Sequence, residues 1–232
     1  MDGATVATVS FGGEGPSLAL VSTSDGSVQT FPLEGGELVE GGPIAFAPDG
    51  SQVVTLERDP ETGVVSLVRR DPSDGALVRS DPLPMPNADA IAFFPSGDRL
   101  VVTGIEPSEL WVLDAETLRS VRTVETQGHA FDISPDGRTL ALGNDDGTVS
   151  LVDIASGART QLEGRHAAQV SGVGFSPDGS TLVTTGDDRD VIVWISRPGP
   201  CARSCTGMPD ARSGPPSMRA ATRHSPSAWT SG

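Results

Sequence analysis

The sequence predicts an all-β protein built from a repeated unit of short antiparallel strands. Glycine and proline are frequent, with 28 and 19 residues among 232, and neither favours the interior of a helix. Segments rich in Val, Leu and Thr alternate with turns rich in Gly, Asp and Pro, which is typical of short strands joined by tight turns. One sequence pattern, an apolar strand followed by a turn and a second apolar strand, is also repeated along the chain.

The repeated segment is centred on a turn of the form Pro-Asp-Gly, with Pro-Ser-Gly at 95–97 in one copy. Its clear copies place the proline at positions 48, 95, 135 and 177, and a degenerate copy precedes them at 9–15. The spacing is therefore about 40–47 residues, as in known strand repeats. Proline fixes φ, aspartate bonds to the nearby backbone and glycine accepts a positive φ, so the segment encodes a hairpin. The turn-forming residues of the last two copies are Asp136, Gly137, Asp178 and Gly179.

Each unit has room for four strands. In the third clear copy, strand-like segments follow one another at 131–133, 139–142, 148–153 and 159–162. Four strands in about 40–45 residues are typical of one blade of a β-propeller. We predict five such units, at residues 5–39, 41–80, 88–123, 128–162 and 166–195.

The fourth clear copy resembles a complete unit of the WD-repeat family. It contains Gly164-Arg-His166, a Ser-Pro-Asp-Gly turn, and Thr184, Asp188 and Trp194 at the spacing of that family. In WD repeats a His, a Ser or Thr, an Asp and a Trp form a hydrogen-bonded chain within one blade. The resemblance, to the bacterial type over about residues 5–196, implies this structural role for His166, Thr184, Asp188 and Trp194. Such a chain satisfies each buried polar group.

The other copies depart from the WD pattern. In the third copy Leu142 and Val152 occupy the Ser/Thr and Trp positions, and in the second copy Leu113 occupies the Trp position. Phe31 takes that position in the degenerate copy, and the first clear copy is irregular around 68–71. A set of four polar residues is therefore predicted for the last unit only.

Signatures of catalysis and metal binding are missing from the sequence. The histidines are His129, His166 and His224, and His129 lies too close to its following strand to match the WD position. The chain contains no Gly-x-Ser-x-Gly elbow, no His-Glu-x-x-His and no lysine for a phosphate loop. Cys201 and Cys205 have no second cysteine pair, which argues against zinc. We expect no catalytic residues, no cofactor and no metal.

Two acidic clusters and one tryptophan have alternative interpretations. The clusters at 145–146 and 187–190 contain the oxygen ligands that Ca²⁺ prefers, but aspartate is also a preferred turn residue. We favour the turn interpretation. Trp111 lies between Leu110 and Val112, as either a core residue or an anchor for a partner.

The charge of the chain is strongly negative. With 31 acidic and 16 basic residues, the net charge is −15, which argues against direct binding of nucleic acid. No run of 18 apolar residues is present, so no membrane span is expected. The first residues lack the features of a signal peptide, and we expect a cytoplasmic protein.

The composition divides the chain at about residue 196. Residues 1–196 form the predicted repeat region, whereas 197–232 are rich in Arg, Pro and Ser and lack strand periodicity. We predict that this tail is disordered. Pro198 and Pro200 argue against an outer strand directly after Trp194, whereas the earlier units have candidates at 37–39, 76–79, 118–122 and 159–162. From this we predict an incomplete propeller with exposed strand edges.

These features favour a non-catalytic scaffold for protein–protein interaction. The resemblance allows such a scaffold to be a module of a larger bacterial signalling or regulatory protein. The alternative is a propeller-type enzyme, lactonase- or hydrolase-like, with a metal or carboxylate site in the central channel. A protein partner is expected and a small-molecule ligand is not, but fold alone does not identify the partner.

Overall fold

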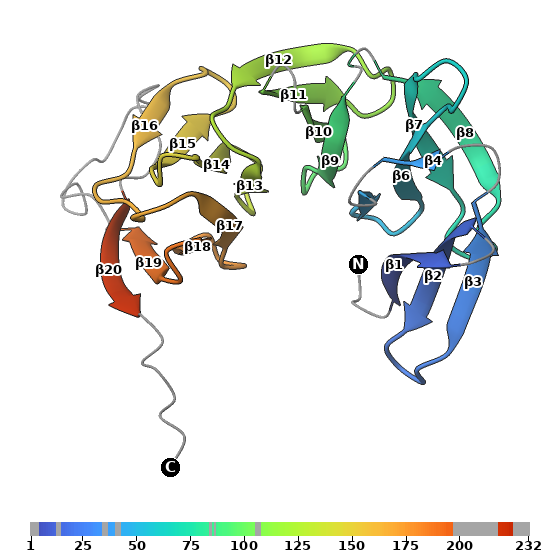
Figure 1. Cartoon of the computed structure of the whole chain (residues 1–232), viewed down its shortest axis with the longest axis horizontal. Helices are drawn as coiled ribbons and strands as arrows, with labels where there is room; N and C mark the ends of the chain where they lie inside the picture. The colour runs from blue at the N-terminus through green and yellow to red at the C-terminus, as the bar shows by residue number, and fades with distance from the viewer. Residues whose placement is uncertain are drawn as a thin grey trace, which may run out of the picture. The chain divides into compact units, whose positions relative to one another are not determined.

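The computed structural model in Figure 1 consists of strands and connecting turns. It describes residues 5–12, 15–33, 37–39, 43–83, 85, 87–104, 108–196 and 218–224. Within these ranges every regular element is a β-strand, and every strand pairing is antiparallel. The chain divides into two compact units, residues 1–125 and 126–232.

The first unit contains three sheets. The first sheet has the order β1-β2-β3 and consists of β1 (Thr5–Gly12), β2 (Gly15–Ser22) and β3 (Val28–Pro32). The second consists of β4 (Glu37–Leu38), β5 (Ile44–Phe46), β6 (Val53–Arg58), β7 (Val65–Arg70) and β8 (Leu77–Pro82). The third consists of β9 (Ala88–Phe93), β10 (Arg99–Gly104), β11 (Glu109–Asp114) and β12 (Ser120–Glu125).

The second unit contains two four-stranded sheets. One is composed of β13 (Ala130–Ile133), β14 (Thr139–Gly143), β15 (Val149–Asp153) and β16 (Arg159–Gln161). The other is composed of β17 (Val170–Phe175), β18 (Thr181–Gly186), β19 (Val191–Ser196) and β20 (Met218–His224). In both sheets the strands follow in chain order. The five predicted units therefore correspond to five blade-like sheets among the described residues.

The middle strands of the blades carry the core. Strands β6 and β10 are buried along almost their whole length, whereas the outer strands β8, β12 and β16 are largely exposed. Strands that are covered on both faces have continuous runs of apolar residues in their sequence, as expected where neighbouring sheets stack. Leu56, Leu67 and Leu100 are fully buried in the first unit, and Leu182 and Trp194 in the second.

The predicted Pro-Asp-Gly hairpins have the expected local structure. Gly137 and Gly179 adopt φ of 67° and 69°, a region that glycine occupies without strain. The Asp136 carboxylate accepts hydrogen bonds from the Ser134 hydroxyl at 2.6 Å and from the Arg138 N–H at 3.0 Å. These side chains connect the first and second strands of the blade, as the turn interpretation requires.

One strand assignment differs from the sequence prediction. Residues 37–39 were expected to form the outer strand of the first unit, but β4 pairs with β6 of the second sheet. Strand β5 pairs only with Val53–Thr55 of β6. On that edge of β6 the backbone groups of Glu57 and Arg58 therefore need another hydrogen-bond partner. Strand β4 provides it, and the Val39 N–H donates to the Leu56 carbonyl at 3.2 Å.

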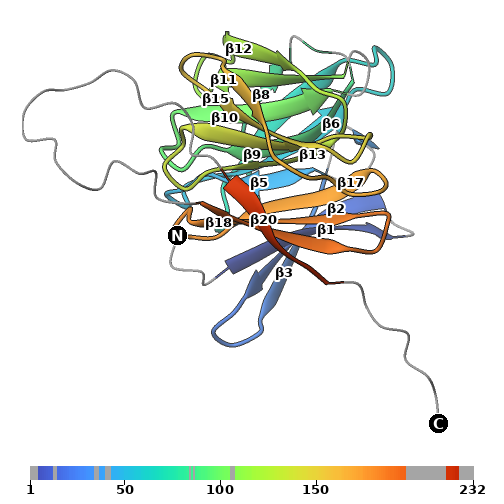
Figure 2. The same ribbon diagram turned by 90° about the vertical axis from the view of Figure 1, so that its left-hand side faces the viewer.

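The structure also differs from the prediction of a wholly disordered tail. Strand β20 pairs along β19, from Val191 with His224 to Ser196 with Met218, and follows the edge of the last sheet (Figures 1 and 2). Residues 218–224 contain no proline or glycine, so every backbone N–H is available for pairing. The rest of the tail, with Cys201, Cys205 and Trp229, lies outside the described residues.

Candidate functional site

The structure brings the four predicted polar residues of the last blade together. The Trp194 Nε1–H donates to Thr184 Oγ1 at 3.0 Å, and Thr184 Oγ1 lies 2.8 Å from His166 Nε2. His166 Nδ1 lies 3.0 Å from Asp188 Oδ1. One proton arrangement satisfies the chain: Thr184 donates to Nε2, and the Nδ1–H donates to Asp188.

The chain of four side chains is enclosed. His166, Thr184 and Trp194 are completely buried, and 8% of the Asp188 side chain is exposed. Burial would raise the pKa of Asp188, but hydrogen bonds from the Ala167 and Asp190 N–H groups and from His166 outweigh it and lower that pKa to about 2. The carboxylate is therefore ionised at neutral pH and holds the segment before β17 against the β18–β19 turn.

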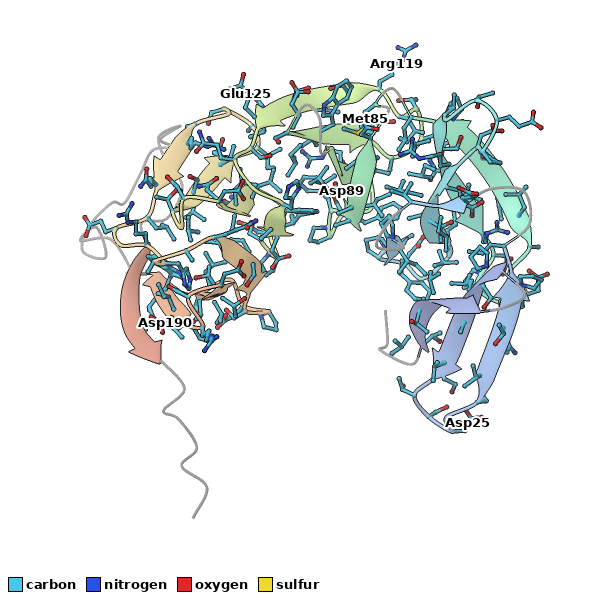
Figure 3. The ribbon with its side chains drawn as sticks, viewed as in Figure 1. Asp25, Met85, Asp89, Arg119, Glu125 and Asp190 are labelled. Atoms are coloured by element: carbon cyan, nitrogen blue, oxygen red, sulfur yellow. The ribbon has the colours of Figure 1, made fainter. Side chains whose placement is uncertain are left out.

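The acidic clusters are used by local turns. Asp146 accepts from the N–H and the hydroxyl of Thr148 at 2.9 and 2.6 Å. Asp25 has the same role at the tip of the β2–β3 hairpin (Figure 3), where it accepts from Ser27. Within the described ranges, no group of three His, Cys, Asp or Glu residues has an arrangement suited to a metal ion.

Trp111 belongs to the core of the first unit. It is half-buried and packs against the apolar cluster of that unit, and its Nε1–H donates to Glu109 at 2.8 Å. His129 is exposed and contributes to none of the four-residue contacts above, and His224 lies on β20. Of the interpretations left open for Trp111, the structure supports the core.

A recess lies between the hairpins of neighbouring blades in the first unit. It has a volume of about 380 Å³ and is lined by the β5–β6 turn, the β9–β10 turn and the segment after β11. Ala47, Pro48 and Phe93 supply apolar surface. A Cβ added to Gly97 would lie 3.6 Å from Pro48 Cδ, so the two hairpins approach each other closely.

Four carboxylates also line this recess. They belong to Asp49, Asp98, Asp114 and Glu116. The backbone N–H of Ser51 lowers the pKa of Asp49, the hydroxyl of Ser96 that of Asp98, and the hydroxyl of Thr117 that of Asp114. These three aspartates are therefore anionic at neutral pH and make the lining of the recess acidic.

The second unit has a recess at the equivalent place. Its volume is about 370 Å³, and Pro135, Phe175 and Asp178 are among its lining residues. A Cβ added to Gly179 would lie 3.6 Å from Pro135 Cδ, which repeats the contact between Gly97 and Pro48. The recess is thus a product of the repeated hairpin and not of one local sequence.

Comparison with known proteins identifies the family of the repeated unit. Residues 119–153 and 159–194 match the family model described as "WD domain, G-beta repeat". The chain contains WD repeats. The second matched segment includes all four residues of the His166–Trp194 hydrogen-bonded chain.

Curated proteins, one of them named for its WD repeats, match parts of the chain. The WD repeat-containing protein SL1-17 of Schistosoma mansoni is 32% identical over 112 residues, which are 47% of this chain and 36% of that protein. The apoptotic protease-activating factor 1 of Danio rerio is 30% identical over 161 residues, 68% of this chain and 12% of that protein. The matched regions thus span little more than a third of these relatives, or less.

A solved structure supports the propeller fold. The β-propeller domain of Myceliophteria thermophila Cps50 (Swd1) has a TM-score of 0.69 and 14% sequence identity, covering 95% of this chain and 68% of that one. At this identity the likeness concerns the fold alone. In the part of the chain that the structure describes, no helix has the length and apolar character needed to cross a membrane.

The blades can be compared position by position. In four blades the inner strand ends in an equivalent pair, namely Phe46–Val53, Phe93–Leu100, Ile133–Leu140 and Phe175–Leu182. The partner of the second residue of each pair on the next strand corresponds to Trp194, and it is Leu113 in the third blade and Val152 in the fourth. The residue two positions after that second residue corresponds to Thr184, and it is Val102 in the third blade and Leu142 in the fourth. All four replacements are buried, so these blades have apolar packing where the last blade has a polar chain.

The second blade contains a polar set that the sequence analysis missed. Arg70 occupies the position of Trp194, and Thr55 that of Thr184. The Arg70 guanidinium and the Thr55 hydroxyl both donate to Glu57 Oε1, at 3.0 and 2.8 Å. All three residues are buried. The sequence feature that could have indicated this set is Glu57, which lies two residues after Thr55 and therefore on the same face of the strand.

Proposed function

We propose that the chain is a non-catalytic scaffold for protein–protein interaction built from WD repeats. The observation that carries this proposal is the recess between neighbouring hairpins, which occurs in both units. Its rims are fixed by hydrogen bonds between turn side chains and the backbone, for example from Ser51 to Asp49 and from Ser180 to Asp178. A binding surface that is formed in advance loses less entropy when a partner binds.

The acidic rims favour partners with basic surfaces. The net charge is −15, and opposite charge accelerates association and selects among partners. We also propose that the chain acts as a module of a larger regulatory protein. The small share of the curated relatives that the matched regions span, 36% and 12%, supports this proposal.

Affinity capture tests the scaffold function. The tagged full chain is immobilised, and a protein retained from a lysate of its own cells is identified, purified and titrated against the chain by calorimetry. We expect one saturable complex with the full chain. Turnover of lactone or ester probes by purified chain, together with a stoichiometric bound metal and no saturable complex, would favour the enzyme alternative.

A further inference from the structure

We propose that an extended segment of a partner protein pairs with the free edge of β3 and completes the first blade as its fourth strand. In this arrangement a basic side chain of the segment lies opposite Phe31. The proposal rests on the scaffold function and adds the location of one binding site and the chemistry of its partner.

The first blade lacks the strand that covers the third strand of the other four blades. Strands β7, β11, β15 and β19 each pair with an outer strand, namely β8, β12, β16 and β20. Strand β3 holds the third position in its blade (Figure 1), but among the described residues it pairs only with β2. Four of its five residues are exposed, whereas β7 and β15 are almost entirely buried.

The free edge of β3 presents a series of backbone groups that an extended chain can pair. The Leu33 N–H donates to the Pro16 carbonyl, so the backbone groups of the odd-numbered residues point towards β2. Those of Val28, Thr30 and Pro32 therefore point outwards, and within the described ranges no other strand pairs with them. Proline has no N–H, so the edge offers two N–H groups and three carbonyl groups. An antiparallel strand added to a sheet edge satisfies such a series.

The edge of β3 also lacks the charges that protect the other outer strands. Strand β3 contains no charged residue, whereas β8, β12, β16 and β20 each contain arginine. Charged side chains on an edge strand discourage pairing with another chain. Among the outermost strands that the structure describes, β3 is therefore the one suited to accept a further strand.

The second blade indicates which side chain fits opposite Phe31. Arg69 of β7 donates to the Ala115 carbonyl in the turn after β11, so the third strand of this blade contacts a turn of the next blade. The residue opposite Arg69 on the outer strand is Arg79. Arg79 pairs with Glu116 of the same turn at 3.0 Å. The outer strand thus holds a cation against an acidic turn of the neighbouring blade.

The corresponding turn beside β3 is also acidic. Phe31 lies against the turn after β7, since a Cβ added to Gly75 would overlap the phenyl ring. This turn contains Asp71 and Asp74, and neither is paired with an arginine among the described residues. The hydroxyl of Ser73 lowers the pKa of Asp71, so this carboxylate is anionic at neutral pH. A basic side chain opposite Phe31 provides the missing cation.

The experiment is a titration of the ¹⁵N-labelled full chain with acetyl-Ser-Val-Arg-Thr-Val-Gln-amide, followed by NMR. The peptide has the sequence of β12 with its glutamate replaced by glutamine, so arginine is its only charge. We expect saturable shifts of the Val28 and Thr30 amide signals and slower hydrogen exchange at both, because their N–H groups gain acceptors. Shifts confined to the outer strands of other blades would overturn the proposal.

Methylation of the peptide backbone separates strand addition from a simple contact between charges. With the peptide arginine opposite Phe31, the N–H of the following threonine faces β3 and that of the next valine faces away. N-methylation of this threonine is expected to weaken binding about tenfold, and N-methylation of the valine leaves binding unchanged. Equal effects of the two methyl groups would contradict the pairing.

The charge of the peptide is tested by replacing its arginine with citrulline, which has a similar shape and no charge. This change is expected to weaken binding about threefold. A citrulline peptide that binds as tightly as the arginine peptide would show that the turn after β7 does not select a basic side chain.

Substitutions in the chain complete the test. Thr30→Pro removes an outward N–H and keeps those that pair with β2, so binding is expected to weaken about tenfold. Asp74→Asn keeps an acceptor for the Ala76 N–H, removes the charge and is expected to weaken binding about threefold. Glu61→Gln, in an exposed turn between β6 and β7, leaves it unchanged. Because the peptide variants need no change in the chain, the test stands even if Thr30→Pro does not fold.

The outcome is separable from that of the scaffold proposal. If the captured partner binds the Thr30→Pro and Asp74→Asn variants with unchanged affinity, the scaffold function stands and the assignment to β3 is wrong. If no partner is captured but the peptide pairs with β3 as described, the assignment stands and the scaffold function fails.

Discussion

At the scale of single residues, the last blade depends on a short chain of buried hydrogen bonds. Asp188 is its only charged end, and it joins His166 to two backbone N–H groups. Gly186 is part of the same arrangement, because a Cβ there would lie 2.6 Å from His166 Nδ1. The local sequence thus leaves space for the imidazole and supplies its acceptor.

Replacing Asp188 by alanine is expected to destabilise the fold by ~1–3 kcal/mol. The variant leaves the buried Nδ1–H of His166 and the Ala167 N–H without their acceptor. Urea denaturation followed by circular dichroism measures the free energy of unfolding, with Asp187→Ala as the matched control because Asp187 is adjacent and exposed. An Asp188→Ala variant as stable as the control would contradict the role assigned to this chain.

The same variant has a defined pH signature. The pKa of Asp188 is lowered from 3.8 to about 2 in the folded chain, so its stabilisation is complete above pH 3.8 and is lost as the pH falls towards 2. We expect the stability difference between the native chain and Asp188→Ala to be constant near neutral pH and to shrink below about pH 4. A difference that grows on acidification would exclude this explanation.

The second blade replaces the WD chain by a buried ion pair. Arg70 and Glu57 are 3.0 Å apart, and each side chain is 7% exposed. Removing one partner of such a pair leaves an uncompensated buried charge, whereas replacing both by apolar residues is often tolerated.

We therefore expect Glu57→Leu alone to destabilise the chain by about 3–5 kcal/mol. The double variant Glu57→Leu/Arg70→Leu is expected to recover most of this loss, since Leu113 occupies the Arg70 position in the third blade. Thermal unfolding of the single and double variants measures the recovery. Additive destabilisation would show that the two residues do not act as a pair.

At the scale of elements, the most consequential feature is β20. It covers the outer edge of β19, whose Ile195 is 46% exposed. An unpaired edge with exposed apolar side chains is a site of association between chains.

Deleting residues 197–232 is expected to produce concentration-dependent dimers or aggregates and to lower the melting temperature. Size-exclusion chromatography with light scattering and thermal melts provide the measurement. A chain that lacks only residues 225–232 keeps β20 and is the control. A monomeric deletion variant with unchanged melting temperature would mean that β20 does not protect this edge.

At the scale of the whole molecule, repetition places acidic turns at corresponding positions of several blades. Asp49, Asp136 and Asp178 occupy the same turn position, and each accepts hydrogen bonds from a residue of its own hairpin. With a net charge of −15, the chain repels polyanions and attracts basic partners. This charge supports the proposed scaffold for partners with basic surfaces.

The sequence by itself determined the hairpins, the number of blades and the polar residues of the last blade. These features depend on residues close together in the chain, because Pro, Asp and Gly act on their own turn and a WD repeat is one continuous segment. The residues His166 and Trp194 fall within a single blade, so the resemblance of this one segment to a WD repeat was enough to predict a set that the structure brings together.

Only the tertiary structure decided the pairing of β4 and β20, the Arg70–Glu57 pair and the recesses. A strand of two residues joins whichever neighbour has unpaired backbone groups, and β20 lies beyond two prolines that argued against a strand. Arg69 donates a hydrogen bond to the carbonyl group of Ala115, which lies 46 positions along the chain in the next blade. Contacts between blades join residues that no local pattern relates, because they depend on how the sheets stack.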